Sequence, residues 1–102
     1  MSFLKRHRWV VVLGWVGMAC ATYLPQEEMV LAEVALEAAR EAKAEVHEPF
    51  FFQKAEFYFK SAKTAYQNRE YDFAKQFALK SKEFSEKAEE GAMVKEVQSQ
   101  EK

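Results

Sequence analysis

The sequence of 102 residues contains only one cysteine, two histidines, three glycines and two prolines. One cysteine excludes an intrachain disulfide, and with two histidines it falls short of the four ligands of a structural zinc site. Few glycines and prolines, together with 49% apolar residues, argue against a disordered linker and a turn-rich β protein. The formal net charge of −1 disfavours nucleic-acid binding through a basic patch. We therefore expect one small domain without metal or cofactor.

The N-terminal residues have the pattern of an export signal. Lys5, Arg6 and Arg8 precede an uncharged, mostly apolar run over residues 9–24. This run is shorter than the roughly 20 residues that a transmembrane helix needs, and small residues lie near its end. We therefore expect residues 1–19 to be a signal peptide, with an uncleaved signal-anchor helix as the alternative. Without this basic segment, the rest of the chain is acidic in balance.

The only cysteine, Cys20, follows residues 17–19 (GMA) at the exit of the apolar run. This segment resembles a bacterial lipobox, in which a small residue precedes a cysteine that becomes lipidated, although Gly17 replaces the usual leucine. Ordinary cleavage after Ala21 would instead release a soluble protein. We favour lipidation of Cys20, because a lone cysteine would otherwise be an odd remnant in an exported chain.

Lipidation would attach the chain to a membrane, and stable attachment takes more than one acyl chain. The resemblance implies the periplasmic side of the cell envelope. An aspartate directly after the lipidated cysteine resembles an inner-membrane retention signal. This chain has Ala21 at that position. We therefore expect anchoring in the outer membrane, with the inner membrane as the alternative.

The rest of the chain is predicted to be all-α, with a three-helix antiparallel bundle over residues 20–91. The first helix, residues 26–46, follows Pro25 and is rich in alanine, the strongest helix former. Its predicted buried face consists of Leu31, Ala35, Ala38, Ala42 and Val46. This face is built mainly from small side chains, so a neighbouring helix can approach it closely.

The second helix, residues 49–67, begins at Pro49, which suits the first helical position. Its predicted buried arc consists of Phe51, Phe52, Ala55, Tyr58, Phe59, Ala62, Ala65 and Tyr66. Phe50 and Phe57 break this pattern, because both fall on the polar side. A turn at residues 68–70 follows, in which Asn68 tolerates a left-handed backbone.

The third helix is predicted over residues 71–90, with Gly91 as its stop and residues 92–102 as a flexible polar tail. Its predicted buried arc consists of Phe73, Ala74, Phe77, Ala78, Ser81, Phe84, Ser85 and Ala88. Leu79 falls outward, against this pattern. We expect the second and third helices to form an antiparallel hairpin with the first helix laid across it.

The hairpin resembles a single tetratricopeptide repeat. The similarity rests on Tyr58-x3-Ala62-x8-Tyr71-x2-Ala74, which places small residues where two antiparallel helices cross. A solenoid needs about three repeats, so we expect no superhelical peptide groove.

A wider resemblance covers nearly all of the chain after the signal. Residues 25–43, 48–59 and 62–78 are similar, in order and spacing, to the bacterial envelope family called domain of unknown function 4398. The shared features are an export signal with a cysteine, an Ala-rich helix, a proline before the second helix, and a charged turn followed by Tyr-x2-Ala. Members are often lipoproteins, and some occur with OmpA-type peptidoglycan-binding domains. The resemblance implies a helical hairpin and an envelope location, and no catalytic residues.

Nothing in the sequence indicates catalysis. A Gly-rich phosphate loop, G-x-S-x-G and H-E-x-x-H are all missing. The glutamate pairs 33/37 and 89/90 are typical of solvated helix surfaces, and no Glu-x-x-His pair supports a di-metal site. His47, at the end of the first helix, is best explained as a charge partner for a helix C-terminus. We expect a protein that is not an enzyme.

Exposed apolar side chains are the remaining candidates for a site. Phe50 and Phe57 share one stripe of the second helix, and Leu79 is exposed on the third. We predict that they bind a protein partner or a second copy of the chain, because aromatic anchors dominate interfaces. The alternative is that the first helix or the tail covers the two phenylalanines.

Three function classes follow from these observations. The first is a lipid-anchored periplasmic structural or adaptor protein that binds envelope proteins, OmpA-type or peptidoglycan-associated ones among them. The second is a single-pass accessory subunit of an inner-membrane complex. The third is a soluble periplasmic protein with a chaperone-like binding function. The state of Cys20 and of the N-terminus distinguishes them.

Overall fold

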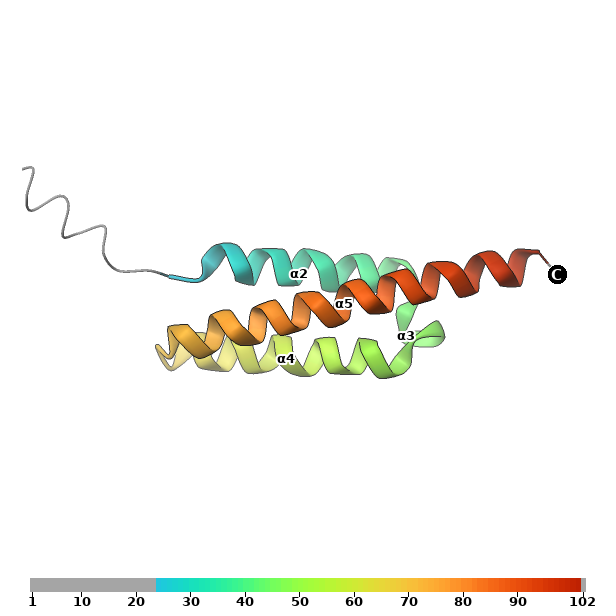
Figure 1. Cartoon of the computed structure of the whole chain (residues 1–102). Coiled ribbons are helices and arrows are strands. Elements are labelled where there is room, and N and C mark those ends of the chain that lie inside the picture. The colour runs from blue at the N-terminus through green and yellow to red at the C-terminus, as the bar shows by residue number, and fades with distance from the viewer. Residues whose placement is uncertain (1–23, 102) are drawn as a thin grey trace, which may run out of the picture.

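The computed structural model of the chain describes residues 24–101, and these residues form helices and no strand. The helices are α2 (Gln26–Glu41), α3 (Ala44–His47), α4 (Pro49–Gln67) and α5 (Tyr71–Gln100). α5 lies between α2 and α4, and α4 runs in the direction opposite to both (Figure 1). The all-α fold and the antiparallel α4–α5 hairpin are confirmed. Residues 1–19 and Cys20, to which we assigned export and lipidation, lie outside the described residues.

The helix predicted over residues 26–46 is not continuous. Lys43 adopts the left-handed backbone with φ 63°, and its N–H donates to the carbonyl of Arg40 at 3.0 Å. A left-handed residue costs about 1–2 kcal/mol when it is not glycine. Contacts of the short α3 offset this cost, because Ala44 is fully buried and His47 pairs with α5. The alanine-rich composition predicts a helix, but it does not indicate where the helix breaks.

The turn between α4 and α5 lies where the sequence predicts it, but its left-handed residue is Arg69, with φ 62°, and not Asn68. The N–H of Glu70 donates to the carbonyl of Ala65 at 2.8 Å, and that of Arg69 to Tyr66 at 3.1 Å. These two bonds form a Schellman motif, which satisfies carbonyl groups at the end of α4. The motif closes the hairpin without glycine.

α5 continues through Gly91 to Gln100, so the predicted stop at Gly91 is wrong, and residues 92–100, predicted as a tail, are helical. Gly91 serves close packing instead. A Cβ built on Gly91 would lie 2.6 Å from Oε1 of Glu48, so a larger residue here would displace the Glu48 side chain. Ala92 is fully buried one residue later, which favours continuation of the helix.

The core consists largely of small side chains. Its buried members include Ala32, Leu36, Ala39, Ala44, Phe52, Ala55, Phe59, Ala62, Ala78, Ala88 and Ala92. Small residues allow the backbones of α4 and α5 to approach closely. Ser81 is fully buried, and its hydroxyl donates to the carbonyl of Ala55 across the two helices at 2.8 Å.

The buried face of α2 differs from the prediction. Ala32, Leu36 and Ala39 are buried, so the true face is rotated by one residue, or about 100°, from the predicted one. Leu31 and Val46, which we expected inside, are exposed. Apolar side chains, Val30, Leu31 and Leu36 among them, occur all around this helix, so its apolar pattern fixes the face poorly.

Candidate functional site

The most distinctive surface is a series of aromatic rings along the seam between α4 and α5. We call it the aromatic ladder, and its rings are Phe50, Phe51, Phe57 and Tyr58 from α4 and Phe73, Phe77 and Phe84 from α5. At its centre, the rings of Tyr58 and Phe84 stack with centroids 5.6 Å apart and planes 1° apart. Phe51 stacks on the other side of Phe84 at 6.2 Å, and Phe77 stacks on Tyr58 at 6.2 Å. The ladder therefore links the two helices along much of the hairpin.

Sequence spacing explains why these rings align. Phe73, Phe77 and Phe84 are separated by four and seven residues, so they lie on one stripe of α5. Phe50 and Phe57, seven residues apart, lie on one stripe of α4. Alanines and serines are the buried residues of α5, and the rings of the ladder pack over the seam beside them. Phe50 and Phe57 are each 63% exposed, and Phe73 is 53% exposed.

The structure shows whether the site residues predicted from the sequence are exposed. Neither the first helix nor the C-terminal residues cover Phe50 and Phe57, so the exposure that we predicted is confirmed. Phe73 was predicted to be buried, and that prediction is wrong. Leu79 is 45% exposed but lies two residues after Phe77, about 200° around α5, so it does not join the ladder.

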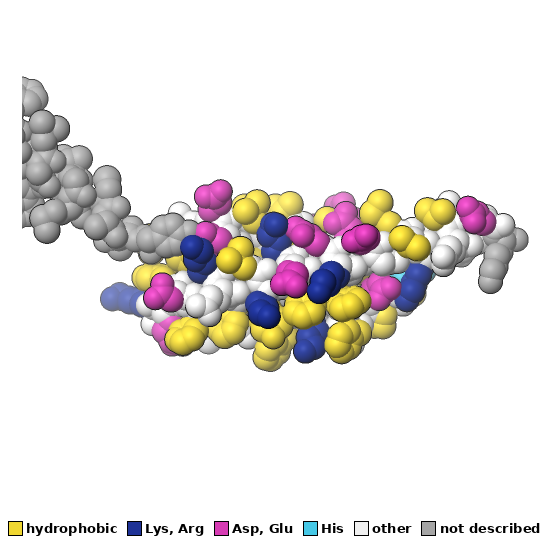
Figure 2. Space-filling model, viewed as in Figure 1, with side chains coloured by type: hydrophobic (Ala, Val, Ile, Leu, Met, Phe, Trp, Pro, Cys, Tyr) yellow, Lys and Arg dark blue, Asp and Glu magenta, His cyan; other side chains and the backbone are white. Residues whose placement is uncertain are grey.

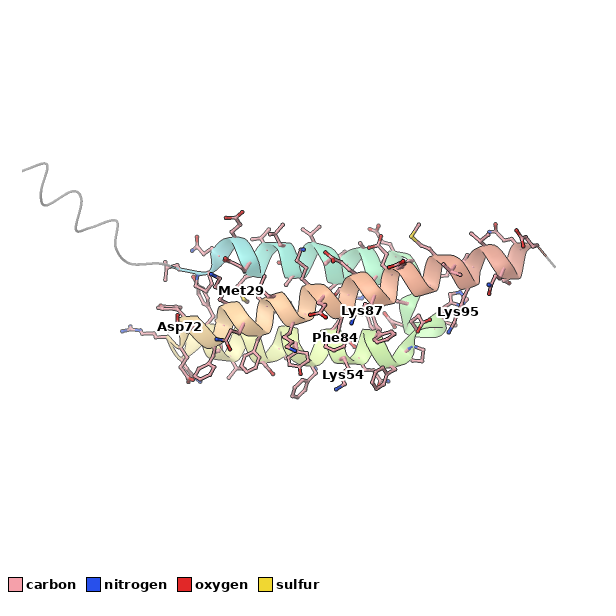
Figure 3. All side chains as sticks on the ribbon, viewed as in Figure 1. Met29, Lys54, Asp72, Phe84, Lys87 and Lys95 are labelled. Carbon is pink, nitrogen blue, oxygen red and sulfur yellow. The ribbon has the colours of Figure 1, made fainter. Side chains whose placement is uncertain are left out.

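Lysines accompany the rings. The Nζ of Lys54 lies 5.6 Å from the ring centroid of Phe50 and 5.9 Å from that of Phe84, and the Nζ of Lys87 lies 5.6 Å from the ring centroid of Phe84. Figure 3 shows Phe84 between these two lysines. Such cation–π contacts hold the ammonium groups over the ring faces. Lys80 occupies the same stripe of α5, three residues after Phe77. We call the ladder with Lys54, Lys80 and Lys87 the aromatic–lysine face.

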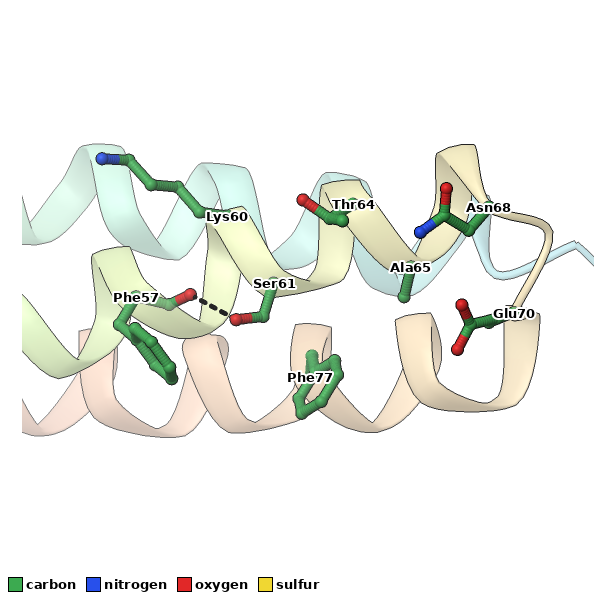
Figure 4. A pocket seen from close by; sticks show the side chains of 8 residues that line it. All are labelled: Phe57, Lys60, Ser61, Thr64, Ala65, Asn68, Glu70 and Phe77. Carbon is green, nitrogen blue, oxygen red and sulfur yellow. Dashed lines mark hydrogen bonds between the residues drawn. The ribbon is translucent and has the colours of Figure 1, made fainter.

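Two hollows border the ring of Phe57. One has a volume of about 450 Å³ and is lined by Phe57, Lys60, Ser61, Thr64, Ala65, Asn68, Glu70 and Phe77 (Figure 4). In this hollow the hydroxyl of Ser61 donates to the carbonyl of Phe57 at 2.9 Å, which turns the Ser61 side chain back onto its own helix. The other hollow has about 350 Å³ and is lined by Phe50, Gln53, Lys54, Phe57 and Tyr58. Phe57 thus projects as a ridge between two concave, largely apolar surfaces.

The outer side of α2 has the opposite charge. Glu27, Val30, Val34, Glu37 and Glu41 are spaced along one stripe and are all exposed. We call this set the acidic stripe. The nearest base, Arg40, pairs with Glu37 at 2.6 Å, with Glu45 at 3.4 Å and with Glu56 at 3.8 Å. Figure 2 shows acidic and hydrophobic side chains together along the upper edge, where α2 lies, and hydrophobic side chains with basic ones along the lower edge.

Polar contacts fix the far end of α5. Nε2 of His47 lies 2.8 Å from Oε2 of Glu96, and Nζ of Lys95 lies 3.0 Å from Oε1 of Glu48. Lys95 also donates to the carbonyl of His47, the last residue of α3, at 2.7 Å. His47 is therefore engaged at a helix end, as the sequence indicated, and these contacts hold the extended part of α5 on α3.

The remaining candidates lack a site geometry. Glu37 of the 33/37 pair is bound to Arg40, and within residues 24–101 no group of three potential metal-binding side chains gathers. None of the helices in this part of the chain is long and apolar enough to cross a membrane. Sequence reasoning missed Lys54 and Phe73, although their spacing from Phe50 and Phe77, four residues in each case, was available.

One of the comparisons with known proteins identifies a family. The model of a family described as Domain of unknown function (DUF4398) matches residues 27–102, most of the chain. Among curated proteins and among solved structures, no match was found.

Proposed function

The chain belongs to the family described as Domain of unknown function (DUF4398), and we propose that it is a non-catalytic structural or adaptor protein of the bacterial cell envelope that binds other proteins through the aromatic–lysine face. The observation that carries this proposal is the exposure of Phe50 and Phe57 on a surface that is otherwise ordered by stacked rings. Exposed aromatic patches of this kind mark interaction sites in small proteins.

The energetics favour binding at this face. Burying a large apolar side chain yields about 1.5–3 kcal/mol, and Phe50, Phe57 and Phe73 each keep more than half of their surface available for it. The rings have few rotatable bonds, and their neighbours already restrict them, since Phe57 packs edge-on against Tyr58 at 5.4 Å. Little side-chain entropy is therefore lost on association.

The envelope location rests on the sequence. A basic segment, a short apolar run and Cys20 after a small residue favour export followed by lipidation. Lipid on Cys20 would attach the bundle to a membrane a few residues before α2 begins at Gln26. Because Ala21, and not an aspartate, follows Cys20, we propose that the anchor lies in the outer membrane, on the periplasmic side.

Mass spectrometry of the native protein tests the anchor. A diacylated or triacylated Cys20 at the N-terminus is the expected result. An intact Met1 would instead indicate a single-pass subunit, and an unmodified N-terminus beyond Cys20 would indicate a soluble binding protein. Either result would contradict lipid anchoring.

Site-specific photocrosslinking in living cells tests the binding face. The full chain carries a benzophenone amino acid in place of Phe57 and, in a control, in place of the exposed Glu90 of α5. We expect adducts with an envelope protein, identified by mass spectrometry, from position 57 and none from position 90. Equal adducts from both positions, or none from either, would contradict the proposal.

A further inference from the structure

The two exposed faces of this protein are complementary to each other. We propose that the aromatic–lysine face of one copy binds the acidic stripe of α2 on a second copy. This inference rests on the proposed function, because it identifies the partner of the same binding face.

Charge is the first argument. Lys54 and Lys80 stand on the aromatic–lysine face without an ion-pair partner among the described residues, while Lys87 pairs with Glu83 at 3.3 Å. The acidic stripe presents Glu27 and Glu41, which likewise form no ion pair within residues 24–101. Bringing the faces together would pair these charges, which favours encounter and fixes register.

The same charges disfavour symmetric pairing. Two aromatic–lysine faces in contact would place Lys54 and Lys80 near the lysines of the other copy, and two acidic stripes would oppose glutamates. Like charges in an interface cost several kcal/mol, so both arrangements are disfavoured. The contact is therefore expected to be head-to-tail, with a different face from each copy.

Shape is the second argument. Val30 and Val34 are 56% and 60% exposed and lie one helical turn apart on the acidic stripe. The ridge of Phe57 is bordered by two hollows of about 350 and 450 Å³, both lined partly by apolar groups. Each hollow has room for a small aliphatic side chain. A valine of the acidic stripe can therefore enter one of the hollows that border Phe57.

The two faces cannot meet within one copy. Val34 is two residues, about 200°, away from the buried Ala32, so the acidic stripe points away from α4 and α5. Binding must occur between copies, and each copy then keeps one face unused. Such a contact builds a ring if its rotation closes and an open chain if it does not.

The test uses two co-expressed full chains with different epitope tags. One copy carries the benzophenone residue at position 57, and the substitution Val34→Lys is placed either in the other copy or in the same copy. We expect an adduct of twice the chain mass that carries both tags. Val34→Lys in the other copy should reduce it about tenfold, as expected for loss of about 1.4 kcal/mol at an anchor. Val34→Lys in the benzophenone copy should leave it unchanged.

Leu79→Lys is the matched control, because it introduces the same charge at an exposed apolar position off both faces. It should leave the adduct unchanged in either copy. A two-tag adduct that is insensitive to Val34→Lys in the other copy would overturn the head-to-tail contact. If position 57 forms adducts only with a different protein, the proposal that a second copy is the partner is wrong, while the proposed function stands. If no adduct forms at all, the proposed function and the contact between copies are both wrong.

Discussion

The ring of Tyr58 in α4 lies parallel to the ring of Phe84 in α5, with 1° between the planes and 5.6 Å between the centroids. This stack joins the two helices of the hairpin outside their alanine-lined interior. It also gives the aromatic ladder a rigid centre, around which the more exposed rings of Phe50, Phe57 and Phe73 are arranged.

The Tyr58–Phe84 stack should contribute measurably to stability. In a double-mutant cycle with Tyr58→Leu and Phe84→Leu, we expect a coupling energy of about 0.5–1.5 kcal/mol, the usual range for aromatic pairs. Urea denaturation of the full chain, followed by circular dichroism, provides the four free energies. Tyr58→Leu with Tyr71→Leu is the control pair, since Tyr71 contacts Tyr66 instead. Equal coupling in both cycles would show that the stack has no specific energy.

Phe52 and Phe57 should differ in their structural role. Phe52 is buried, so Phe52→Ala should lower the free energy of unfolding by about 3–5 kcal/mol. Phe57→Ala removes a ring that is mostly in solvent and should cost about 1 kcal/mol or less. Thermal unfolding of the two variants measures the difference. Similar losses of stability would mean that Phe57 belongs to the core and not to a binding surface.

Two buried serines of α5 should respond oppositely to alanine. The hydroxyl of Ser81 donates to the carbonyl of Ala55 at 2.8 Å, so Ser81→Ala should cost about 1 kcal/mol. The hydroxyl of Ser85 has no hydrogen-bond partner among the described residues, so Ser85→Ala should be neutral or stabilising by about 0.5 kcal/mol. Both serines lie in α5 and both are fully buried, so each variant is the control for the other. A larger loss for Ser85→Ala would refute this account of the interface.

The effect of Gly91→Ala on the free energy of unfolding should change sign with the residue at position 48. Alanine is favoured over glycine inside a helix by about 1 kcal/mol, but its Cβ would collide with Glu48 and disturb the ion pair to Lys95. We expect Gly91→Ala to destabilise the natural chain and to stabilise a chain that carries Glu48→Ala. Melting temperatures of the four combinations test this. Stabilisation in both backgrounds would mean that Glu48 moves aside freely.

The sequence predicted the hairpin better than the first helix. Rings and alanines repeat clearly in residues 49–90, so the buried faces of α4 and α5 were identified except at Phe73. In α2 apolar residues lie on all sides, and the buried face depends on how the helix packs against α5. The left-handed Lys43 and the helix beyond Gly91 depend on contacts between α3 and α5, which local propensity does not contain.

The candidate site was predictable only in part. Helical periodicity alone placed Phe50 and Phe57 on the polar side, and that exposure is confirmed. The pairing of Tyr58 with Phe84 depends on the register between two helices, which periodicity within each helix does not determine. For the same reason Leu79 was grouped with the phenylalanines, although α5 directs it elsewhere.

The most direct test of the central claim separates binding from stability. The full chain carries the benzophenone residue at Phe73, on the aromatic–lysine face, and the substitutions Phe50→Ala and Phe57→Ala are added together. We predict that crosslinking to the partner falls at least about tenfold, while the melting temperature falls by no more than the few degrees that correspond to about 1 kcal/mol in a domain of this size. Unchanged crosslinking with a large fall in melting temperature would contradict the claim that this face binds a protein.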